Sequence, residues 1–221
     1  MRGLKRKRVA VIGLGRFGTN VALTLTELGC KVLAVDSEME NINKIAALVD
    51  KAIQADVTKE ECLAELGLEQ YDAVVLTIGS NLQASIMTAL GLKNLGVLKT
   101  VAKASSELHK KALEKVGVDH VVFPEKDSAI KLAHSLMSVN LVEYLEISPN
   151  LQIAEIIIQG KYHGQTLKET GIRNKHNLNV LAIRNKDKIN SSPQADHVLH
   201  KGDRLIILGS SQDLKEFSDN C

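Results

Sequence analysis

The sequence predicts an α/β protein, in which a doubly wound parallel sheet over residues 7–138 is followed by a small α+β domain over residues 139–221. Three observations support this prediction. Apolar runs alternate with helix-period segments through the first part of the chain. The first run, RVAVIGLG, leads directly into a glycine-rich turn, and the alternation stops near residue 139. Continuous apolar strands that alternate with helices are typical of a parallel sheet covered on both faces.

The elements of the first domain follow from these patterns in chain order. Runs of Val, Ile, Leu and Ala predict strands over residues 8–15, 31–36, 51–56, 71–80, 98–105 and 120–125. Helical spacing of apolar residues predicts helices over residues 18–29, 38–49, 58–67, 81–96, 107–117 and 127–138. We expect Gly29 to end the first helix, and Thr58 with Glu61 to form a capping box at the third.

The second domain reads as strands joined by short turns. A turn is predicted at Pro149-Asn150, before an apolar run over residues 151–160. A short helix is expected over residues 165–171, and further strands lie in the segments 177–193 and 203–217, the last of which ends in a helix. A small mixed α+β domain is the expected result.

The composition narrows the function classes. Net charge is +2 and aromatic residues make up 3% of the chain, with no Trp. A nucleic-acid partner is therefore not expected, because base-binding surfaces rely on basic patches and aromatic platforms. Three Cys residues without a CxxC spacing suggest reduced thiols in the cytoplasm. No run of about 18 uninterrupted apolar residues occurs, so no membrane span is expected.

The first turn has the pattern of a nucleotide-phosphate loop. Gly13, Gly15 and Gly18 satisfy G-x-G-x-x-G between a strand and a helix. The first glycine makes the tight turn, the second lets the backbone approach phosphate, and the third allows close packing of helix on strand. Phosphates would lie over the helix N-terminus, where free N–H groups and the helix dipole favour anions. Phe17 belongs to the same loop.

Asp36 ends the second strand, 18 residues after Gly18. An acidic residue near this spacing accepts hydrogen bonds from ribose hydroxyls and repels a 2′-phosphate, which disfavours NADP. Together these features predict an adenine-nucleotide site in a Rossmann-like domain. The alternative is a glycine turn that serves packing only.

Other predicted strands end at the same crevice, because the carboxyl ends of parallel strands share one edge of the sheet. They bring Asp56, Ile78, Gly79, Lys103 and Glu125 toward it. Asp56 could flank the base or ribose, Gly79 allows close backbone approach, and Lys103 could reach phosphate. Each of these residues taken alone is more often an ordinary loop residue.

Arg16 distinguishes two kinds of nucleotide. It lies in the first turn of the helix, beside the expected phosphates. A dinucleotide pyrophosphate is largely satisfied by backbone N–H groups, whereas a terminal phosphate has room for a guanidinium fork. Arg16 therefore favours a mononucleotide di- or triphosphate. An arginine that points to solvent is the alternative.

Motifs for catalysis are missing. A hydride-transfer enzyme needs an acid or base near the nicotinamide, and no Tyr is followed by Lys four residues later. Neither G-x-S-x-G nor G-x-x-x-x-G-K-[ST] occurs. We expect a non-enzyme, with a small NAD-dependent oxidoreductase as the alternative. A redox-sensing transcriptional regulator is a third hypothesis, but it would need a basic recognition helix, which is not visible.

The motifs together resemble the RCK (TrkA-type) cytosolic regulatory subunits of Ktr potassium transporters. In the first domain these are VAVIGLGRFG, VLAVD, QADVT, VVLTIGSNLQAS, VAKA and VGVDHVVFPEK. GIRNKHNLNVLAIRN, followed by SSP and GDRLIILG, resembles the TrkA C-terminal domain. The resemblance covers nearly the entire chain.

The resemblance implies a nucleotide-gated ring at the inner face of the cell membrane. Such subunits form dimers that assemble into an octameric ring under a membrane potassium-translocating subunit of the KtrB or KtrD type. ATP favours the active state and ADP the inactive state, and NAD(H) can occupy the same site. The implied location is cytoplasmic and peripheral to the membrane.

The resemblance also implies roles for single residues. Arg16 matches the arginine that reaches the γ-phosphate of ATP, Asp36 the ribose-binding acid, and Lys103 a nucleotide-contacting lysine. Glu125 matches a carboxylate near the nucleotide and the dimer interface that is associated with a divalent cation. Asp56 is a departure, because relatives can carry Asn there.

A second ligand is implied for the C-terminal domain, which in such proteins can bind cyclic di-AMP at its dimer interface. Arg173 and Asn179 match positions of that motif, and Pro193 lies nearby in the sequence. Binding there is associated with inhibited transport.

Overall fold

The chain forms two compact units in a computed structural model that describes residues 6–79, 81–137, 140–148, 150–186 and 188–221. The first unit is Met1–Glu125 and the second is Lys126–Cys221. The sequence predicts that the helix over residues 127–138 belongs to the first domain. In the structure the helix is Pro124–Met137, and only its first two residues belong to the first unit. The functional boundary near residue 138 stays a prediction.

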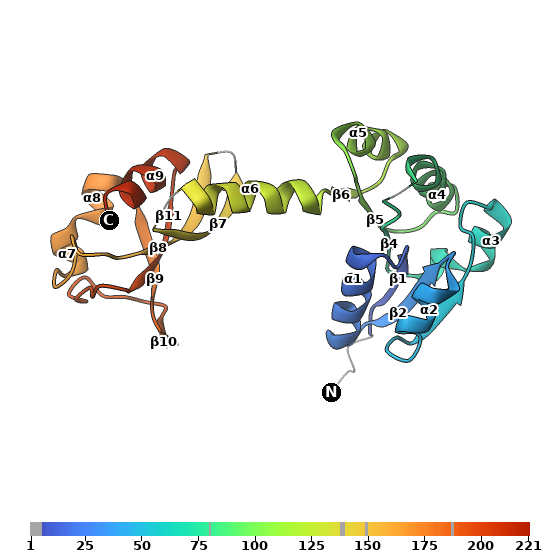
Figure 1. The fold of residues 1–221 in the computed structure, drawn as a ribbon, viewed down its shortest axis with the longest axis horizontal. Coiled ribbons are helices and arrows are strands. Elements are labelled where there is room, and N and C mark those ends of the chain that lie inside the picture. The colour runs from blue at the N-terminus through green and yellow to red at the C-terminus, as the bar shows by residue number, and fades with distance from the viewer. Residues whose placement is uncertain (1–5, 80, 138–139, 149, 187) are drawn as a thin grey trace. The chain divides into compact units, whose positions relative to one another are not determined.

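A parallel sheet forms the centre of the first unit, as predicted (Figure 1). Its strands are β1 (Arg8–Ile12), β2 (Lys31–Asp36), β3 (Lys51–Gln54), β4 (Ala73–Leu76), β5 (Thr100–Lys103) and β6 (His120–Val122). The six-stranded order is β3-β2-β1-β4-β5-β6, so the direction of winding reverses between β1 and β4. Ligands of open α/β sheets bind at this reversal, outside the carboxyl ends of the strands.

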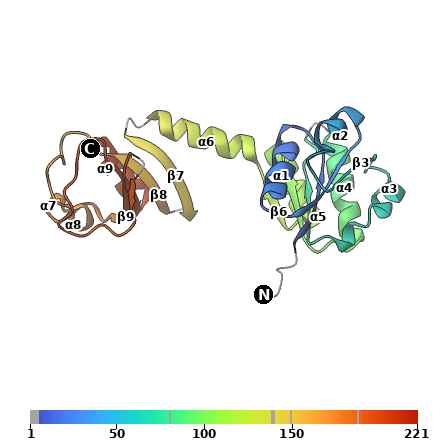
Figure 2. The ribbon, with the colours of Figure 1, turned by 90° about the horizontal axis from the view of Figure 1, so that it is seen from below.

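Helices cover both faces of this sheet (Figure 2). They are α1 (Arg16–Glu27), α2 (Met39–Ile45), α3 (Glu60–Glu65), α4 (Leu82–Asn94) and α5 (Glu107–Val116), with a short 3-10 helix, η1 (Leu68–Gln70). Ala22 of α1 and Ile42 of α2 pack in one core with Val11 of β1. Leu63 of α3, Leu92 of α4 and further residues pack in the other core, with Ile12 of β1. The doubly wound Rossmann-like fold is therefore confirmed.

Several elements are shorter than predicted, such as β4 and α2, and two local predictions differ in kind. The Thr58–Glu61 capping box is wrong, because the N-cap of α3 is Lys59 and no side chain caps it. Thr58 precedes this N-cap, and its hydroxyl donates to Asp56 Oδ1 at 2.6 Å in a local side-chain bond. The expected strand over residues 120–125 ends at Val122, and α6 (Pro124–Met137) begins with Pro124, whose fixed φ suits the first helical position.

The second unit is a small antiparallel sheet with short helices, which confirms the predicted α+β class. Its strands are β7 (Leu141–Ser148), β8 (Leu151–Ile157), β9 (Asn179–Asn185), β10 (Lys188–Asn190) and β11 (Arg204–Gly209), in the five-stranded order β10-β9-β11-β8-β7. Its further helices are α7 (Leu167–Thr170), α8 (Ile172–His176) and α9 (Ser211–Asp219). The sequence analysis did not predict β7 or α8, and the expected turn residue Pro149 lies outside the described residues.

One sheet face of the second unit holds its core. Ile156 and Ile207 project from β8 and β11 onto Phe217 of α9, and all three are fully buried. Tyr162 stacks on Phe217 with ring centroids 5.5 Å apart. This core is separate from the two cores of the first unit, so each unit has an apolar interior of its own. Among the described helices, none combines the length and apolar character needed to cross a membrane.

Candidate functional site: a pocket at the carboxyl edge of the parallel sheet

A pocket of about 1280 Å³ opens at the carboxyl ends of the parallel strands, within the first unit. The residues predicted for a nucleotide site in this unit all line it: Gly13, Gly15, Arg16, Phe17, Gly18, Asp36, Asp56, Ile78, Gly79, Lys103 and Glu125. They come from the ends of β1, β2, β3, β4 and β5 and from the starts of α1 and α6. The parallel topology therefore brings together residues that are far apart in the sequence.

The glycine loop is held by steric requirements at two positions. Gly13 has φ +91°, which favours glycine, and a Cβ there would lie 3.1 Å from the backbone of Ile78. A Cβ at Gly18 would overlap the Gly13 carbonyl oxygen and the Thr77 hydroxyl. At Gly15 a Cβ would meet nothing within 4 Å, so open space lies above the N-terminus of α1. A phosphate group fits this arrangement, because backbone N–H groups can approach it there.

Thr77 supports this loop and was not predicted. Its hydroxyl lies 2.5 Å from the carbonyl oxygen of Gly13, to which it donates, and 3.1 Å from that of Ile12. The side chain is buried and joins the end of β4 to the turn after β1. Its position directly after the fourth apolar strand was the signal available in the sequence, because such positions face the crevice.

Asp36 is oriented by two backbone amides at the end of β2. Leu14 N–H donates to Oδ2 at 2.5 Å, and Glu38 N–H donates to Oδ1 at 2.8 Å. The carboxylate thus links the glycine loop to the turn after β2, and as a lining group it has capacity for further hydrogen bonds. Such a carboxylate can accept hydrogen bonds from two adjacent hydroxyl groups of a sugar.

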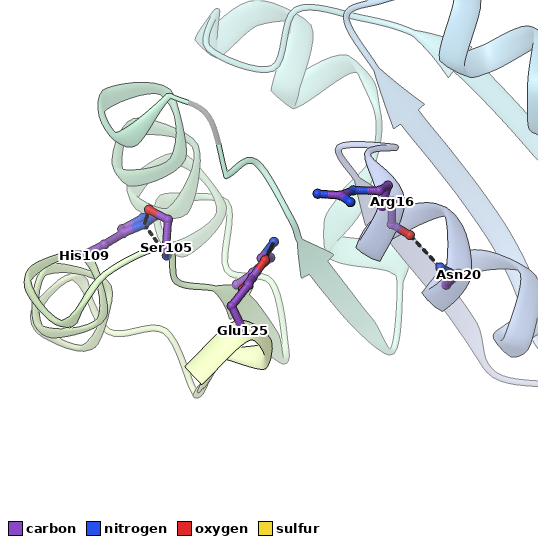
Figure 3. Close-up of polar contacts among 6 residues, drawn as sticks. Arg16, Asn20, Ser105, His109 and Glu125 are labelled. Atoms are coloured by element: carbon purple, nitrogen blue, oxygen red, sulfur yellow. Dashed lines mark hydrogen bonds and ion pairs between the residues drawn. The ribbon is translucent and has the colours of Figure 1, made fainter. Parts of the chain in front are cut away.

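Arg16 is the first residue of α1 and is exposed. Its carbonyl oxygen accepts a hydrogen bond from Asn20 Nδ2 at 2.8 Å, within the first turn. Figure 3 shows the guanidinium extending from α1 toward the side of the pocket where Glu125 lies. The guanidinium also lowers the pKa of Glu125, although less than Lys103 does. An anion in the pocket would therefore meet an exposed, always charged donor at this end.

Lys103 and Glu125 form an ion pair on the opposite wall. Nζ and Oε1 lie 2.6 Å apart, and the lysine side chain is 15% exposed while that of Glu125 is 62% exposed. The hydrogen bond from Lys103 is the main cause that holds the pKa of Glu125 below its usual value. Lys103 Nζ also lies 5.7 Å from the centre of the Phe17 ring. Lys103 is thus a shielded cation held between an aromatic face and a carboxylate.

Asp56 lies at the mouth of the pocket after β3. Its Oδ1 accepts hydrogen bonds from the hydroxyl and the backbone N–H of Thr58, and these bonds lower the pKa of the carboxyl group. Lys59 Nζ is 3.9 Å from the other oxygen. The side chain is exposed, so it is available to a ligand only at the rim.

Further lining residues were missed by the sequence analysis. They follow strand ends or begin helices: Ser37, Asn41, Asn81, Ala84, Ser105 and Phe123. Asn81 caps α4 by accepting a hydrogen bond from Ala84 N–H at 3.0 Å. The sequence placed these segments at the carboxyl edge, but nothing in it distinguished these side chains from other loop residues.

The two residues predicted for the C-terminal domain belong to the second unit and do not line this pocket. Arg173 lies on α8 and Asn179 begins β9, and both are exposed. Asn177, between them, takes the left-handed φ of 53° that ends α8. Pro193 lies in the loop after β10. Their role in binding stays a prediction.

A metal site at Glu125 also stays a prediction. Within the described part of the chain, no group of three or more His, Cys, Asp or Glu side chains could hold a metal ion. A cation at Glu125 would therefore need further oxygen ligands, which phosphate groups or a second copy of the chain could supply.

Comparison with known proteins identifies the domains. The TrkA-N domain model matches residues 9–124, and the TrkA-C domain model matches residues 153–221. The chain is 41% identical to Ktr system potassium uptake protein C of Bacillus subtilis, over 96% of both chains. It is 36% identical to Ktr system potassium uptake protein A of the same organism, over 98% of this chain and 97% of the relative.

Solved structures agree with the fold. The GsuK RCK domain matches 99% of this chain and 48% of its own, with a TM-score of 0.66 and 18% identity. The NAD(P)-binding domain of an exopolyphosphatase-related protein from Archaeoglobus fulgidus matches 60% of this chain and 98% of its own, with a TM-score of 0.53 and 27% identity. With a pocket at the carboxyl edge of its TrkA-N domain and a TrkA-C domain that follows in the sequence, the chain belongs to the TrkA-type family that includes the Ktr system potassium uptake proteins A and C.

Proposed function

We propose that this chain is the nucleotide-gated regulatory subunit of a membrane potassium uptake system and acts at the cytoplasmic face of the membrane. One observation supports this most directly: in a chain 41% identical to a Ktr potassium uptake protein, two cationic side chains line a glycine-loop pocket. The membrane potassium-translocating subunit, of the KtrB or KtrD type, is the partner that this role requires.

The ligand of the pocket is an adenine nucleotide. The ribose binds at Asp36, the phosphates lie over Gly15 at the start of α1, and Arg16 and Lys103 neutralise the outer phosphates. ATP and ADP fit this charge arrangement best. NAD(H) is a further occupant, since a relative in fold is named as an NAD(P)-binding domain and the glycine loop suits a pyrophosphate.

ATP activates and ADP inactivates in this proposal, because the two ligands differ by one charged phosphoryl group. A ligand shifts a conformational equilibrium only by its differential affinity for the two states. Arg16 supplies that difference if its guanidinium meets the γ-phosphate in one state only. In this proposal dimers assemble into an octameric ring, and ATP binding favours one conformation of the ring by about 1 kcal/mol per subunit. The summed free-energy difference would exceed the roughly 5.5 kcal/mol needed for a near-complete switch.

Glu125 connects the pocket to the next part of the chain. It is the second residue of α6, and most of α6 belongs to the second unit. In the proposal Glu125 and the nucleotide phosphates share a divalent cation, so that the charge of the ligand acts on the start of this helix. The motion would then pass along α6 to neighbouring subunits.

The second unit binds cyclic di-AMP in this proposal, through Arg173 and Asn179 at a dimer interface. Both side chains are exposed, and a guanidinium suits a phosphodiester. Binding there would inhibit transport. Titration of the full-length protein with cyclic di-AMP should saturate, and Arg173→Ala should weaken binding, whereas a flat calorimetric titration at tens of micromolar ligand would contradict this part.

The chain does no chemistry of its own in this proposal. The alternative is a small NAD-dependent oxidoreductase, which the resemblance of the first unit to an NAD(P)-binding domain keeps open. The two are separated by incubating the purified protein with NADH: the oxidoreductase predicts turnover with some acceptor, whereas the regulatory subunit predicts binding alone.

The decisive experiment measures ATP and ADP binding by calorimetry and potassium flux in vesicles that contain the membrane partner. The wild type should discriminate between the nucleotides, and flux should follow ATP. Arg16→Ala should bring the two affinities closer together, because it removes the group that meets the γ-phosphate. Lys31→Ala, which removes an exposed charge at the amino end of β2, is the matched control. An unchanged ATP/ADP ratio in Arg16→Ala would contradict the gating mechanism.

A further inference from the structure

His109 is a fully buried histidine beside the pocket that the proposed function does not use. It lies in the first turn of α5, with no exposed surface. Its ring bridges two segments: Nε2 lies 3.1 Å from Ser85 Oγ on α4, and Nδ1 lies 3.2 Å from the backbone nitrogen of Ser105. Buried polar groups with such complete hydrogen bonding hold a local arrangement in place.

The contacts define the protonation state of the ring. A backbone N–H can only donate, so Nδ1 accepts from Ser105, whose hydroxyl oxygen also lies 3.1 Å from the same nitrogen. A neutral ring then carries its hydrogen on Nε2 and donates to Ser85. A second proton on Nδ1 would face the N–H group of Ser105, so this N–H group would lose its acceptor and the ring could donate only to the Ser105 hydroxyl oxygen. The bond from the Ser105 backbone is therefore made only to a ring without a proton on Nδ1.

The electrostatic surroundings agree with the geometry. Burial lowers the pKa of His109 below its ordinary value of 6.5. Charged groups on the neighbouring elements are engaged elsewhere: Lys103 pairs with Glu125, Lys110 with Glu114, and the Lys93 chain lies against Gly117. Among the described residues, none of these charges contributes to the shift.

One partner of the ring lines the pocket, and the other is the neighbour of a lining residue. Ser105 lines the pocket and follows Lys103 by two residues, at the end of β5. Ser85 follows Ala84, which lines the pocket at the start of α4. Figure 3 shows the ring of His109 behind Ser105, on the same side of the pocket as Glu125. A change at His109 would therefore reach the Lys103 side of the pocket through the backbone of Ser105.

We propose that neutral His109 is a positioning residue, which ties the β5–α5 turn to α4 and so holds the Lys103 wall of the pocket in its ligand-binding geometry. This inference rests on the proposed nucleotide site. It makes nucleotide affinity sensitive to acid: protonation of Nδ1 breaks the bond from the Ser105 backbone N–H group, the wall loses its order, and nucleotide binding must restore that order. The contribution of neutral His109 to nucleotide affinity is complete above pH 6.5. It is lost as the pH falls from there through the lowered pKa of His109 in the folded protein.

The test compares ADP affinity of the full-length wild type and two variants between about pH 7.5 and about pH 5.5. His109→Asn retains an acceptor near Nδ1, and His109→Gln retains a donor near Nε2, and neither side chain titrates. The wild type should lose about fivefold to tenfold more affinity than His109→Asn as pH falls. Because each ratio is taken at one pH, the titration of ADP itself cancels. His120→Asn, at an exposed histidine outside the pocket, should follow the wild type.

The second measurement is nitrogen NMR of the imidazole in the wild-type protein. It does not depend on whether the variants fold. It should show Nδ1 unprotonated and Nε2 protonated at neutral pH, and the Ser105 amide should exchange faster once the ring titrates. Parallel pH profiles of wild type and folded His109→Asn, or a proton on Nδ1, would overturn the proposal. Failure of the wild type to bind ADP at neutral pH would instead count against the proposed function, and the NMR and exchange data would still decide the role of His109.

Discussion

The two units place their polar residues in different ways. In the first unit the strands run parallel, so residues from the ends of β1, β2 and β5 meet at one edge and line one pocket. In the second unit the strands are antiparallel, and the two predicted ligand residues, Arg173 and Asn179, lie exposed on α8 and at the start of β9. The parallel sheet brings its predicted site residues to one pocket, whereas Arg173 and Asn179 of the second unit do not line that pocket.

The two units also differ in the interactions that stabilise their predicted binding regions. The pocket of the first unit depends on close backbone approach at Gly13 and Gly18, and on the buried hydroxyl of Thr77. The region around Arg173 depends on short helices, including the capping box between Thr166 and Glu169 at α7. Substitutions should therefore affect the first unit through sterics and ligand charge, and the second mainly through local stability.

Gly18→Ala should have the largest effect of the substitutions considered and should act on the first unit. The added methyl group would overlap the Gly13 carbonyl oxygen and the Thr77 hydroxyl, so the glycine loop must move. We expect a loss of roughly 2–4 kcal/mol in the free energy of unfolding, together with loss of ADP binding. Hydrogen exchange can assign the destabilisation to peptides of the first unit.

Gly15→Ala is the matched control for the stability measurement. Its φ is −66°, and a Cβ there would meet nothing within 4 Å. It should leave exchange in the first unit unchanged. Equal destabilisation by the two substitutions would mean that crowding at Gly18 is not what holds the loop, and the contrast between the units would lose its steric basis.

Much of the first unit could be predicted from its sequence, and less of the second. Apolar runs and the glycine spacing predict the order of elements, and parallel topology then places Asp36, Lys103 and Glu125 at one edge. The pairing of Lys103 with Glu125 could not be predicted, because it depends on α6 beginning at Pro124 rather than after a longer strand. The role of His109 depends on Ser105, four residues before it, and on Ser85, 24 residues before it. No spacing rule predicts the contact with Ser85, because tertiary packing brings α4 to the ring.

The second unit could not be predicted as fully, because the pairing of its strands depends on tertiary contacts that local sequence patterns do not indicate. β7 gave no clear pattern in the sequence, yet it pairs with β8 along most of its length. The same difficulty appears at the capping boxes. One was predicted at Thr58, but the Thr58 hydroxyl donates to the Asp56 carboxylate instead. One that was not predicted forms at Thr166, at the start of a helix of only four residues. A threonine hydroxyl has several local partners, so the sequence pattern alone does not predict which of these bonds forms.

Lys103→Met should have an intermediate effect and separates ligand charge from stability. It removes a cation from the pocket, so ATP and ADP affinities should fall by about 10- to 100-fold. The free energy of unfolding should change by less than about 1 kcal/mol, because the partner Glu125 is 62% exposed and solvent screens the pair. Calorimetry and urea unfolding measure the two quantities on one preparation.

Lys110→Met is the matched control, since its pair with Glu114 spans 3.9 Å on the outer side of α5 and neither residue lines the pocket. It should bind nucleotides as the wild type does. If Lys103→Met lost stability in proportion to affinity, Lys103 would be a structural residue. Charged side chains would then act on local stability in the first unit, as we expect for the second.

Thr166→Ala should have the smallest effect and should be confined to the second unit. It removes the hydroxyl that accepts from Glu169 N–H at the start of α7, and such caps contribute about 1 kcal/mol. Hydrogen bonds from the backbone and side chain of Thr166 lower the pKa of Glu169 from 4.5, so its contribution is present above pH 4.5 and is lost as pH falls through the lowered value. The difference in hydrogen exchange between wild type and Thr166→Ala should therefore shrink in acid. Thr166→Ser keeps the hydroxyl and should behave as the wild type, whereas a difference that persists unchanged below pH 4.5 would show that the Glu169 half of the box contributes nothing to the second unit.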